Sequence, residues 1–272
     1  MADVRLAIAG ADGRMGRALI EAALSSNGLR VTAALDVPGS PALGRDAGEH
    51  CGRTTGVCVG SDVDVALQAA DVLIDFTRPD GTMTHAAACA RLGVAAVVGT
   101  TGLSAAQKSE LAAFAGSVPM VLAANMSVGV NVLLSLVEAA ARTLGPDYDV
   151  EILEMHHRHK VDAPSGTALM LGEAAATGLD RTLAECAVYA REGHTGERPA
   201  GTIGFAALRG GDVVGEHTVI FAANGERVEL AHRATSRQNF AGGALRAAAF
   251  VAGRRNARAT GLFDMRDVLG LR

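Results

Sequence analysis

Hydrophobic and polar positions alternate in blocks along the first 125 residues of the chain. Short apolar runs recur, and alanine-rich segments with a helical pattern separate them. The apolar runs predict buried strands over 4–10, 31–36, 72–76, 94–99 and 118–124. The segments between them predict helices over about 14–25, 80–91 and 104–115. Strict alternation of strand and helix is typical of a parallel sheet with helices on both faces.

The pattern changes after Asn125. A long helix is predicted over 128–144, and it leads into the alternating run VEILEMHH. The segment HTVIFAANGERVELAHRA predicts a hairpin around Asn224-Gly225, a pair that suits a tight turn with positive φ. We therefore expect a second domain on a mostly antiparallel or mixed sheet, followed by a helix near 240–252 that returns the chain to the first domain. The predicted division is 1–127 with 238–272 as one domain and 128–237 as the other.

A glycine-rich turn, GADGRMG, joins the first predicted strand to the first helix. Glycine at 10, 13 and 16 lets the chain turn sharply, so that a pyrophosphate can approach free N–H groups at the positive end of the helix. An ordinary strand-to-helix turn would give the same pattern. Asp36, at the end of the second strand, is placed to accept hydrogen bonds from an adenosine ribose, although it also suits a plain turn residue. Together the two features favour a nicotinamide dinucleotide over a flavin.

The residue after Asp36 bears on the choice between NADH and NADPH. Binding of a 2′-phosphate calls for a basic residue nearby, yet Val37 stands here, and only Arg14 and Arg45 are candidates. The sequence therefore favours NADH and leaves NADPH open. Two later loops, DFTRP and GTTG, follow strands at the sheet edge where open α/β sheets bind ligands. Their small and hydroxyl-bearing residues suit ribose and nicotinamide, and equally suit helix caps.

The segment EMHHRHKVDAPSGTA carries three histidines, an arginine and a lysine within five positions. If the strand stays extended, the side chains at 156, 158 and 160 share one face, so His156 and Lys160 point into a common cleft. Histidine exchanges protons near neutral pH, and lysine stabilises an anion or delivers a proton. The following turn predicts a helix capped by Ser165, whose free N–H groups bind carboxylates or phosphates. The combination predicts a small anionic substrate with more than one carboxylate.

Three other interpretations of this basic segment are a metal site, a solvated edge and a phosphate-binding patch without catalysis. No acid or cysteine stands at a supporting spacing, and the neighbouring cations would repel a metal ion, so we predict no metal.

Composition narrows the class further. There are 29 acidic and 25 basic residues and nine aromatic ones, which argues against a nucleic-acid binder. The four cysteines are scattered without a C-x-x-C pair, as expected in a reducing compartment. No apolar run approaches about 18 residues, and the N-terminus lacks a basic start. We therefore expect a cytoplasmic protein without a membrane span.

These motifs, together with AANMSVGVN, REGHTGERPAGTIGFA and GLFDMRDVL, resemble those of the 4-hydroxy-tetrahydrodipicolinate reductases, also called dihydrodipicolinate reductases, of lysine and diaminopimelate biosynthesis. They occur in order across nearly the whole chain, and EMHHRHKVDAPSGTA is the most specific of them. The resemblance implies an α/β fold: a Rossmann-like parallel-sheet domain, to which the C-terminal segment returns, and a smaller α+β mixed-sheet domain that binds substrate and forms a homotetramer. It implies hydride transfer from NADH or NADPH to a cyclic dicarboxylate imine, with loss of water.

The resemblance also implies roles for individual residues. His156 is the expected proton donor and acceptor, and Lys160 the expected proton donor. The expected substrate contacts are His157, Ser165, Gly166 and Thr167. The expected cofactor contacts are Gly10, Ala11, Asp12, Gly13, Arg14, Met15, Asp36, Arg78, Gly99, Thr100, Thr101, Ala123, Ala124, Asn125 and Met126.

Two positions depart from the family pattern. Val37 replaces the arginine of members that use both cofactors well, and Met126 replaces a phenylalanine, which should alter packing near the nicotinamide more than chemistry. Another dehydrogenase on the same scaffold would lack the joined HHRHK and PSGTA elements. A non-enzymatic NAD sensor would need the glycine turn but neither His156 nor Lys160.

Overall fold

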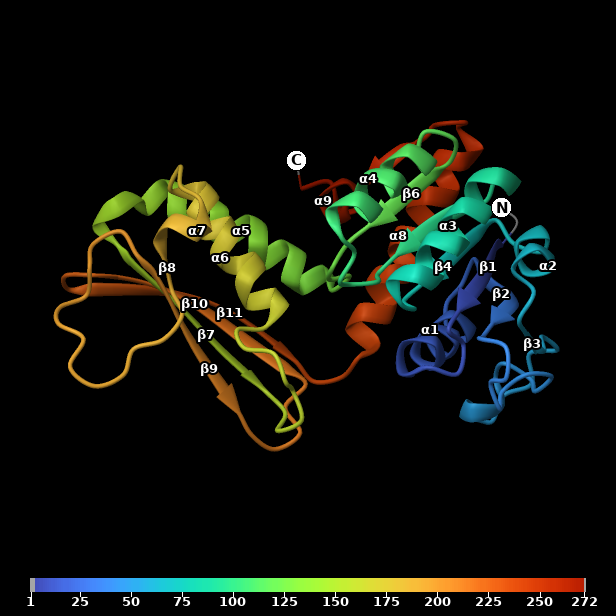
Figure 1. Ribbon diagram of the computed structural model, residues 1–272, viewed down its shortest axis with the longest axis horizontal. Helices are drawn as coiled ribbons and strands as arrows, with labels where there is room; N and C mark the ends of the chain where they lie inside the picture. The colour runs from blue at the N-terminus through green and yellow to red at the C-terminus, as the bar shows by residue number, and fades with distance from the viewer. Residues whose placement is uncertain (1–2, 272) are drawn as a thin grey trace. The chain divides into compact units, whose positions relative to one another are not determined.

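The computed structural model describes residues 3–271, and the chain divides into two compact units (Figure 1). Unit 1 comprises the chain up to Val128 together with Arg237–Gly270, and unit 2 is Gly129–Ser236. Each unit has its own hydrophobic core.

Unit 1 is built on a seven-stranded sheet in which all neighbouring strands are parallel, as the alternating pattern predicts. The strand order is β12-β6-β5-β4-β1-β2-β3. Every residue of the central strands β4 and β5 is buried, because helices cover both faces. The strands are β1 (Val4–Ala9), β2 (Leu29–Leu35), β3 (Val59–Gly60), β4 (Val72–Asp75), β5 (Ala95–Val98), β6 (Pro119–Leu122) and β12 (Gly261–Phe263).

Two groups of helices enclose this sheet. Helices α1 (Arg14–Leu24) and α8 (Gln238–Asn256) pack together on one face, and α3 (Pro79–Leu92) and α4 (Ala105–Phe114) lie on the other (Figure 1). The expected return of the C-terminal segment to the first domain is confirmed, because α8 packs against the sheet and β12 pairs with β6. The pattern did not predict β3, β12 or the short helices α2 (Val63–Gln68), α9 (Met265–Leu269) and η1 (Glu49–Cys51).

Unit 2 is built on a five-stranded mixed sheet of order β11-β10-β7-β9-β8. Strand β10 is antiparallel to β7 and β11, whereas β7, β9 and β8 run parallel. The predicted hairpin is confirmed, with Gly225 at φ 88° in its turn. The strands are β7 (Asp149–His156), β8 (Ala187–Val188), β9 (Ile203–Arg209), β10 (Gly215–Ala223) and β11 (Glu226–Ala234); the helices are α5 (Val128–Leu144), η2 (Gly145–Asp147), α6 (Gly166–Gly178) and α7 (Leu183–Cys186).

The two faces of the mixed sheet differ. Helices α5 and α6 cover one face, where alternate strand residues such as Ile152, Phe205 and Val219 are buried (Figure 1). The stretch 128–147 is long and apolar enough to cross a membrane, but α5 packs much of its apolar side into this core. The opposite face, which we call the open face, carries apolar side chains that stay exposed: Leu153 is 36% exposed and Leu208 is 47% exposed.

Candidate active site

The glycine turn of unit 1 has the geometry that a pyrophosphate requires. Gly10 adopts φ 68°, and a Cβ at Gly16 would lie 2.1 Å from the Gly10 carbonyl oxygen, so helix α1 packs directly on the turn. The N-cap residue Gly13 supplies no side-chain cap, and the first turn of α1 contains no acid. The N–H groups of Arg14 and Met15 therefore point out of the helix without an intrahelical partner. This uncapped positive helix end fits the phosphates of a dinucleotide.

Asp36 follows directly on β2 and organises the same turn. Its carboxylate accepts hydrogen bonds from the backbone N–H of Asp12 and from that of Val37, both at 2.8 Å. Each oxygen keeps a lone pair, so Asp36 can still accept the hydroxyl groups of a ribose. Arg45, a candidate for a 2′-phosphate, instead donates from Nε and a terminal nitrogen to Glu49 at 2.8 Å. Arg14 is exposed and makes no hydrogen bond or ion pair through its side chain within residues 3–271.

The loops after β4 and β5 are joined by a buried polar network that the sequence did not reveal. Asp75 is fully buried; its carboxylate accepts from the Thr77 N–H and hydroxyl, each at 2.7 Å, and lies 2.8 Å from His85 Nδ1. Burial alone would raise the pKa of Asp75, but these hydrogen bonds outweigh burial and hold the pKa below its usual value. The hydroxyl of Thr100, an expected cofactor contact, lies 2.7 Å from that of Thr82. The network therefore fixes both loops, while Arg78 and Thr101 stay exposed.

The segment 123–126, directly after β6, would offer a ligand mainly backbone atoms. Met126 is 1% exposed and packs in the core of unit 1, and Asn125 is also buried. Its amide oxygen accepts the Ser127 N–H at 2.8 Å. A ligand that reaches this segment would meet Ala123 and Ala124, which are partly or fully exposed, rather than the Met126 side chain. Gly99 has to be glycine, because a Cβ there would lie 2.2 Å from the Phe76 ring.

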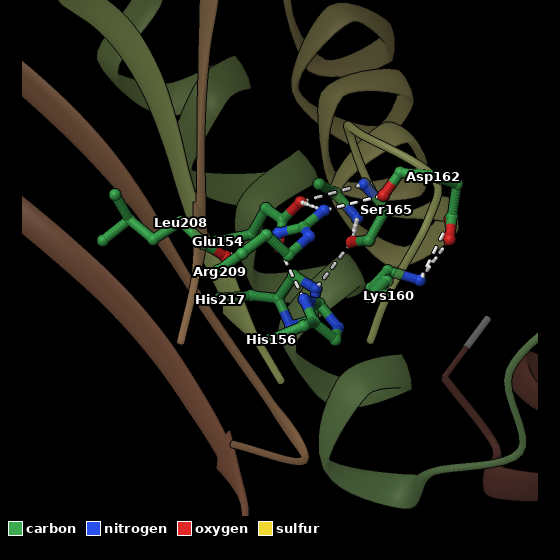
Figure 2. A network of polar contacts seen from close by, with 9 residues as sticks. Glu154, His156, Lys160, Asp162, Ser165, Leu208, Arg209 and His217 are labelled. Carbon is green, nitrogen blue, oxygen red and sulfur yellow. Dashed lines mark hydrogen bonds and ion pairs between the residues drawn. The ribbon is translucent and has the colours of Figure 1, made fainter. Parts of the chain in front are cut away.

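In unit 2, β7 ends at His156. The residue that orients this histidine, Glu154, was not predicted from the sequence. Figure 2 shows that Glu154, two positions earlier on the same strand face, meets the imidazole: His156 Nδ1 lies 2.5 Å from Glu154 Oε2. Glu154 is 1% exposed and also accepts two hydrogen bonds from Arg209, both at 2.8 Å. The strand alternation already placed Glu154 on the face of His156. Burial lowers the pKa of His156, partly offset by Glu154.

The condition that the strand stays extended through Lys160 is not met. The chain turns after His156, and the Lys160 N–H donates to the His157 carbonyl oxygen at 3.1 Å. The turn, not strand alternation, sets the position of the Lys160 ammonium group, which donates to both carboxylate oxygens of Asp162 at 2.8 and 2.9 Å. Lys160 still acts on His156, since its positive charge is among the causes that lower the pKa of His156. The two side chains are therefore coupled electrostatically, while Figure 2 shows the Lys160 ammonium group bonded to Asp162.

The predicted cap of α6 is confirmed: the Ser165 hydroxyl accepts the Ala168 N–H at 3.2 Å. Ser165 is 2% exposed, and its own N–H donates to Glu154 at 3.1 Å. Both polar groups of Ser165 are thus engaged within the protein. Gly166 and Thr167 occupy the first positions of α6, at the positive end of the helix. This helix end fits a carboxylate.

A second buried histidine, His217 of β10, supports the cap. His217 Nε2 lies 3.0 Å from the Ser165 hydroxyl, and its ring meets that of His156 edge-on at 5.1 Å between centroids. Burial lowers the pKa of His217 to about 4, so this ring is neutral at physiological pH. The Nδ1 atoms of His157 and His217 are buried and have no hydrogen-bond partner within residues 3–271.

Unit 1 combines a parallel sheet with an uncapped glycine turn beside Asp36. Unit 2 carries His156, Lys160 and the positive N-terminus of α6. These features are those expected of an oxidoreductase that uses a nicotinamide cofactor. Comparisons with known proteins narrow this class. Residues 4–126 match the N-terminal domain described as "Dihydrodipicolinate reductase, N-terminus", and residues 129–269 match "Dihydrodipicolinate reductase, C-terminus". The chain belongs to the dihydrodipicolinate reductase family.

Individual relatives match the sequence of this chain over its full length. The chain is 59% identical to the 4-hydroxy-tetrahydrodipicolinate reductase of Cupriavidus necator, over 99% of this chain and 100% of the relative. It is 57% identical to the enzyme of the same name from Nitrosospira multiformis, over 100% of both chains. Among solved structures, a dipicolinate-bound dihydrodipicolinate reductase from Paenisporosarcina sp. TG-14 aligns with a TM-score of 0.74 and 23% identity, covering 96% of this chain and 97% of the other. The last match supports the fold.

Proposed function

We propose that the chain reduces 4-hydroxy-tetrahydrodipicolinate to tetrahydrodipicolinate, with loss of water, in lysine and diaminopimelate biosynthesis. The observation that supports the proposal is that the junction of β7 and α6 carries His156, the Lys160 ammonium group and the positive N-terminus of α6. A dicarboxylate with a ring nitrogen needs one group to hold a carboxylate and another to deliver a proton. This junction offers both.

The substrate carboxylate is held at the start of α6. The Gly166 and Thr167 N–H groups and the positive helix end attract the anion, and His157 contacts the same molecule. Lys160 delivers the proton, and His156 exchanges protons through Nε2, since its Nδ1 faces Glu154. The cofactor supplies the hydride when bound, on the cradle that Gly10–Met15, Asp36, Arg78, 99–101 and 123–126 form.

A coupled assay tests the reaction. Pyruvate and aspartate semialdehyde are passed through the synthase that makes the substrate, and loss of reduced-nicotinamide absorbance is followed with NADH and NADPH in parallel. We expect oxidation that depends on the synthase product. NADH binding without oxidation would point instead to another substrate on this scaffold or to a sensor.

Cofactor preference is a separate prediction. We expect NADH to bind more tightly than NADPH, because a 2′-phosphate would meet the Asp36 carboxylate while Val37, 67% exposed, offers no compensating charge. Arg14 is the remaining cation for the phosphate. Calorimetric titration of both cofactors checks the order, and Val37→Arg should improve NADPH binding roughly tenfold through a charge-assisted hydrogen bond. Tighter NADPH binding by the unchanged protein would contradict the argument from Asp36 and Val37.

We further propose that the protein is a cytoplasmic homotetramer that assembles through the open face of unit 2. The apolar side chains Leu153 and Leu208 are exposed on neighbouring strands there, and charged pairs such as Arg233–Glu216 flank them on β10 and β11. Exposed apolar patches with a polar rim are typical of protein interfaces.

Light scattering after size exclusion tests the assembly. We expect a mass about four times 27.7 kDa, and smaller species for Leu153→Glu. Val65→Glu is the matched control, since Val65 is 64% exposed on α2 of the other unit. An unchanged mass for Leu153→Glu would move the interface elsewhere, and a monomeric unchanged protein would refute the tetramer.

A further inference from the structure

Glu154 occupies an unusual place for an acid. It stands in the helix-facing row of β7, where its neighbours in the row are Ile152 and His156, and it is 1% exposed. A carboxylate at such a position is costly unless hydrogen bonds compensate for lost hydration. Burial would raise the pKa of Glu154, but hydrogen bonds from Arg209 and His156 outweigh burial and hold the pKa below its usual value. Glu154 is therefore a carboxylate at neutral pH.

Four hydrogen bonds from three segments converge on this carboxylate (Figure 2). Oε2 accepts from His156 Nδ1 at 2.5 Å and from Arg209 at 2.8 Å. Oε1 accepts from the second Arg209 nitrogen at 2.8 Å and from the Ser165 N–H at 3.1 Å. Arg209 in turn donates to the Asp162 carbonyl oxygen at 2.7 Å, so β9 also secures the loop that carries Lys160.

The first of these bonds decides which imidazole nitrogen carries the proton. A carboxylate only accepts, so Nδ1 of His156 must donate, and in the neutral ring Nε2 is left as the acceptor. The protein leaves space at this nitrogen: a Cβ on Gly215 would lie 3.0 Å from Nε2. Nε2 makes no hydrogen bond within residues 3–271, so it is the nitrogen that can exchange a proton with a ligand.

We propose that Glu154 is the positioning residue of this site: its bond to Nδ1 fixes the His156 tautomer, and its bond from the Ser165 N–H holds the carboxylate-binding turn of α6 beside that histidine. Arg209 holds the Glu154 carboxylate in place. This inference rests on the proposed function, because it assigns Glu154 to the same proton-transfer site. Glu154 itself does not touch the substrate and acts through His156 and the Ser165 N–H. The Glu154 carboxylate thus fixes both the turn of α6 that holds an anion and the His156 nitrogen that exchanges a proton with that anion.

The variant Glu154→Gln keeps the size of the side chain but removes its charge. We expect kcat in the coupled assay to fall by about 10- to 100-fold, by analogy with the loss of a hydrogen-bond partner that orients a metal-bound histidine. The Kd for NADH should stay the same, because the cofactor cradle lies in unit 1. The charges that face His156 are Glu154 on its own strand, Arg209 on β9 and Lys160 in the turn, with neutral His217 on β10. Only Glu154 raises the His156 pKa, so the limb of the pH profile due to His156 should move to lower pH.

Glu151→Gln is the matched control. Glu151 belongs to the same strand but to the other face, and it too has arginine partners: Arg191 and Arg198 donate to it, as Arg209 donates to Glu154. A general effect of losing a strand carboxylate with arginine partners would lower kcat in both variants. We expect Glu151→Gln to keep the unchanged protein's kcat and pH profile. Activity within twofold of the unchanged protein for Glu154→Gln, with the same pH limb, would overturn the proposal.

Nitrogen NMR of the unchanged protein gives a second readout that depends neither on the folding of Glu154→Gln nor on turnover. With ¹⁵N-histidine labelling, and with His156→Asn to identify the signal among eight histidines, His156 should appear with Nδ1 protonated and Nε2 bare at neutral pH. The reverse tautomer would overturn the proposal even if the reductase activity is real. Absence of activity together with the expected tautomer would instead refute the proposed function and leave the geometry standing.

Discussion

Replacing Lys160 by alanine should lower kcat by about 10²- to 10⁴-fold, the range for loss of a positioned proton donor, while NADH affinity stays unchanged. Lys160 is one of only two lysines in the chain. Its ammonium group lies in the electrostatic environment of His156, while the turn that presents it is held by the backbone bond from its N–H to His157. Alanine keeps that bond, so the loss should fall on the chemical step. Steady-state kinetics and calorimetry with NADH measure the two quantities.

Two further variants separate the possible roles of the lysine. Lys160→Arg keeps the positive charge but not an acid that can give up its proton, so we expect a nearly normal KM with a kcat still far below the unchanged protein. Lys108→Ala, the exposed second lysine on α4, should be fully active. Normal turnover of Lys160→Ala would assign proton delivery to another group. Full recovery by Lys160→Arg would reduce the lysine to an anchor for the substrate anion.

The sequence allowed prediction of those parts of the fold that local patterns determine. The strands of unit 1 appear in the sequence as apolar runs, because helices bury both of their faces. The Asn224-Gly225 pair predicted a hairpin, because few residue pairs accept positive φ. The short strand β12 gave no such signal, since it is stable only through pairing with β6. The shared face of His156 and Lys160 depended on an extended chain, and the sequence gives no sign that β7 ends at His156.

The candidate site was predictable where one motif supplies both its residues and its local structure. The α6 turn is such a case, since Ser165 caps the helix directly after the basic segment. Glu154 is the opposite case. Strand alternation placed it beside His156, yet a buried acid is credible only once Arg209, 55 positions away, is known to face it. Likewise, the residues next to Asp75 do not show that His85, ten positions later, faces the carboxylate and helps Thr77 to hold its pKa below the usual value.

Gly243→Ala should be among the most destabilising single substitutions in unit 1, although it raises the helix propensity of α8. A Cβ at Gly243 would lie 1.7 Å from the carbonyl oxygen of Met126. A backbone atom cannot rotate away as a side chain can, so either α8 or the 123–126 segment has to shift. We expect a loss of about 3 kcal/mol or more in the free energy of unfolding, at the upper end of the usual cost of overpacking. Thermal and urea unfolding measure it.

The adjacent glycine provides the control for this prediction. A Cβ at Gly242 meets no atom within 4 Å, so Gly242→Ala should stabilise α8 by about 0.5–1 kcal/mol. The pair also tests the cofactor cradle, because a shift of 123–126 caused by Gly243→Ala should weaken NADH binding, whereas Gly242→Ala should leave it unchanged. Equal stability of the two variants would mean that α8 does not approach Met126 this closely. Normal NADH affinity in a destabilised Gly243→Ala protein would remove 123–126 from the cofactor contacts. The segment displaced by the new methyl group would then have no part in holding the dinucleotide.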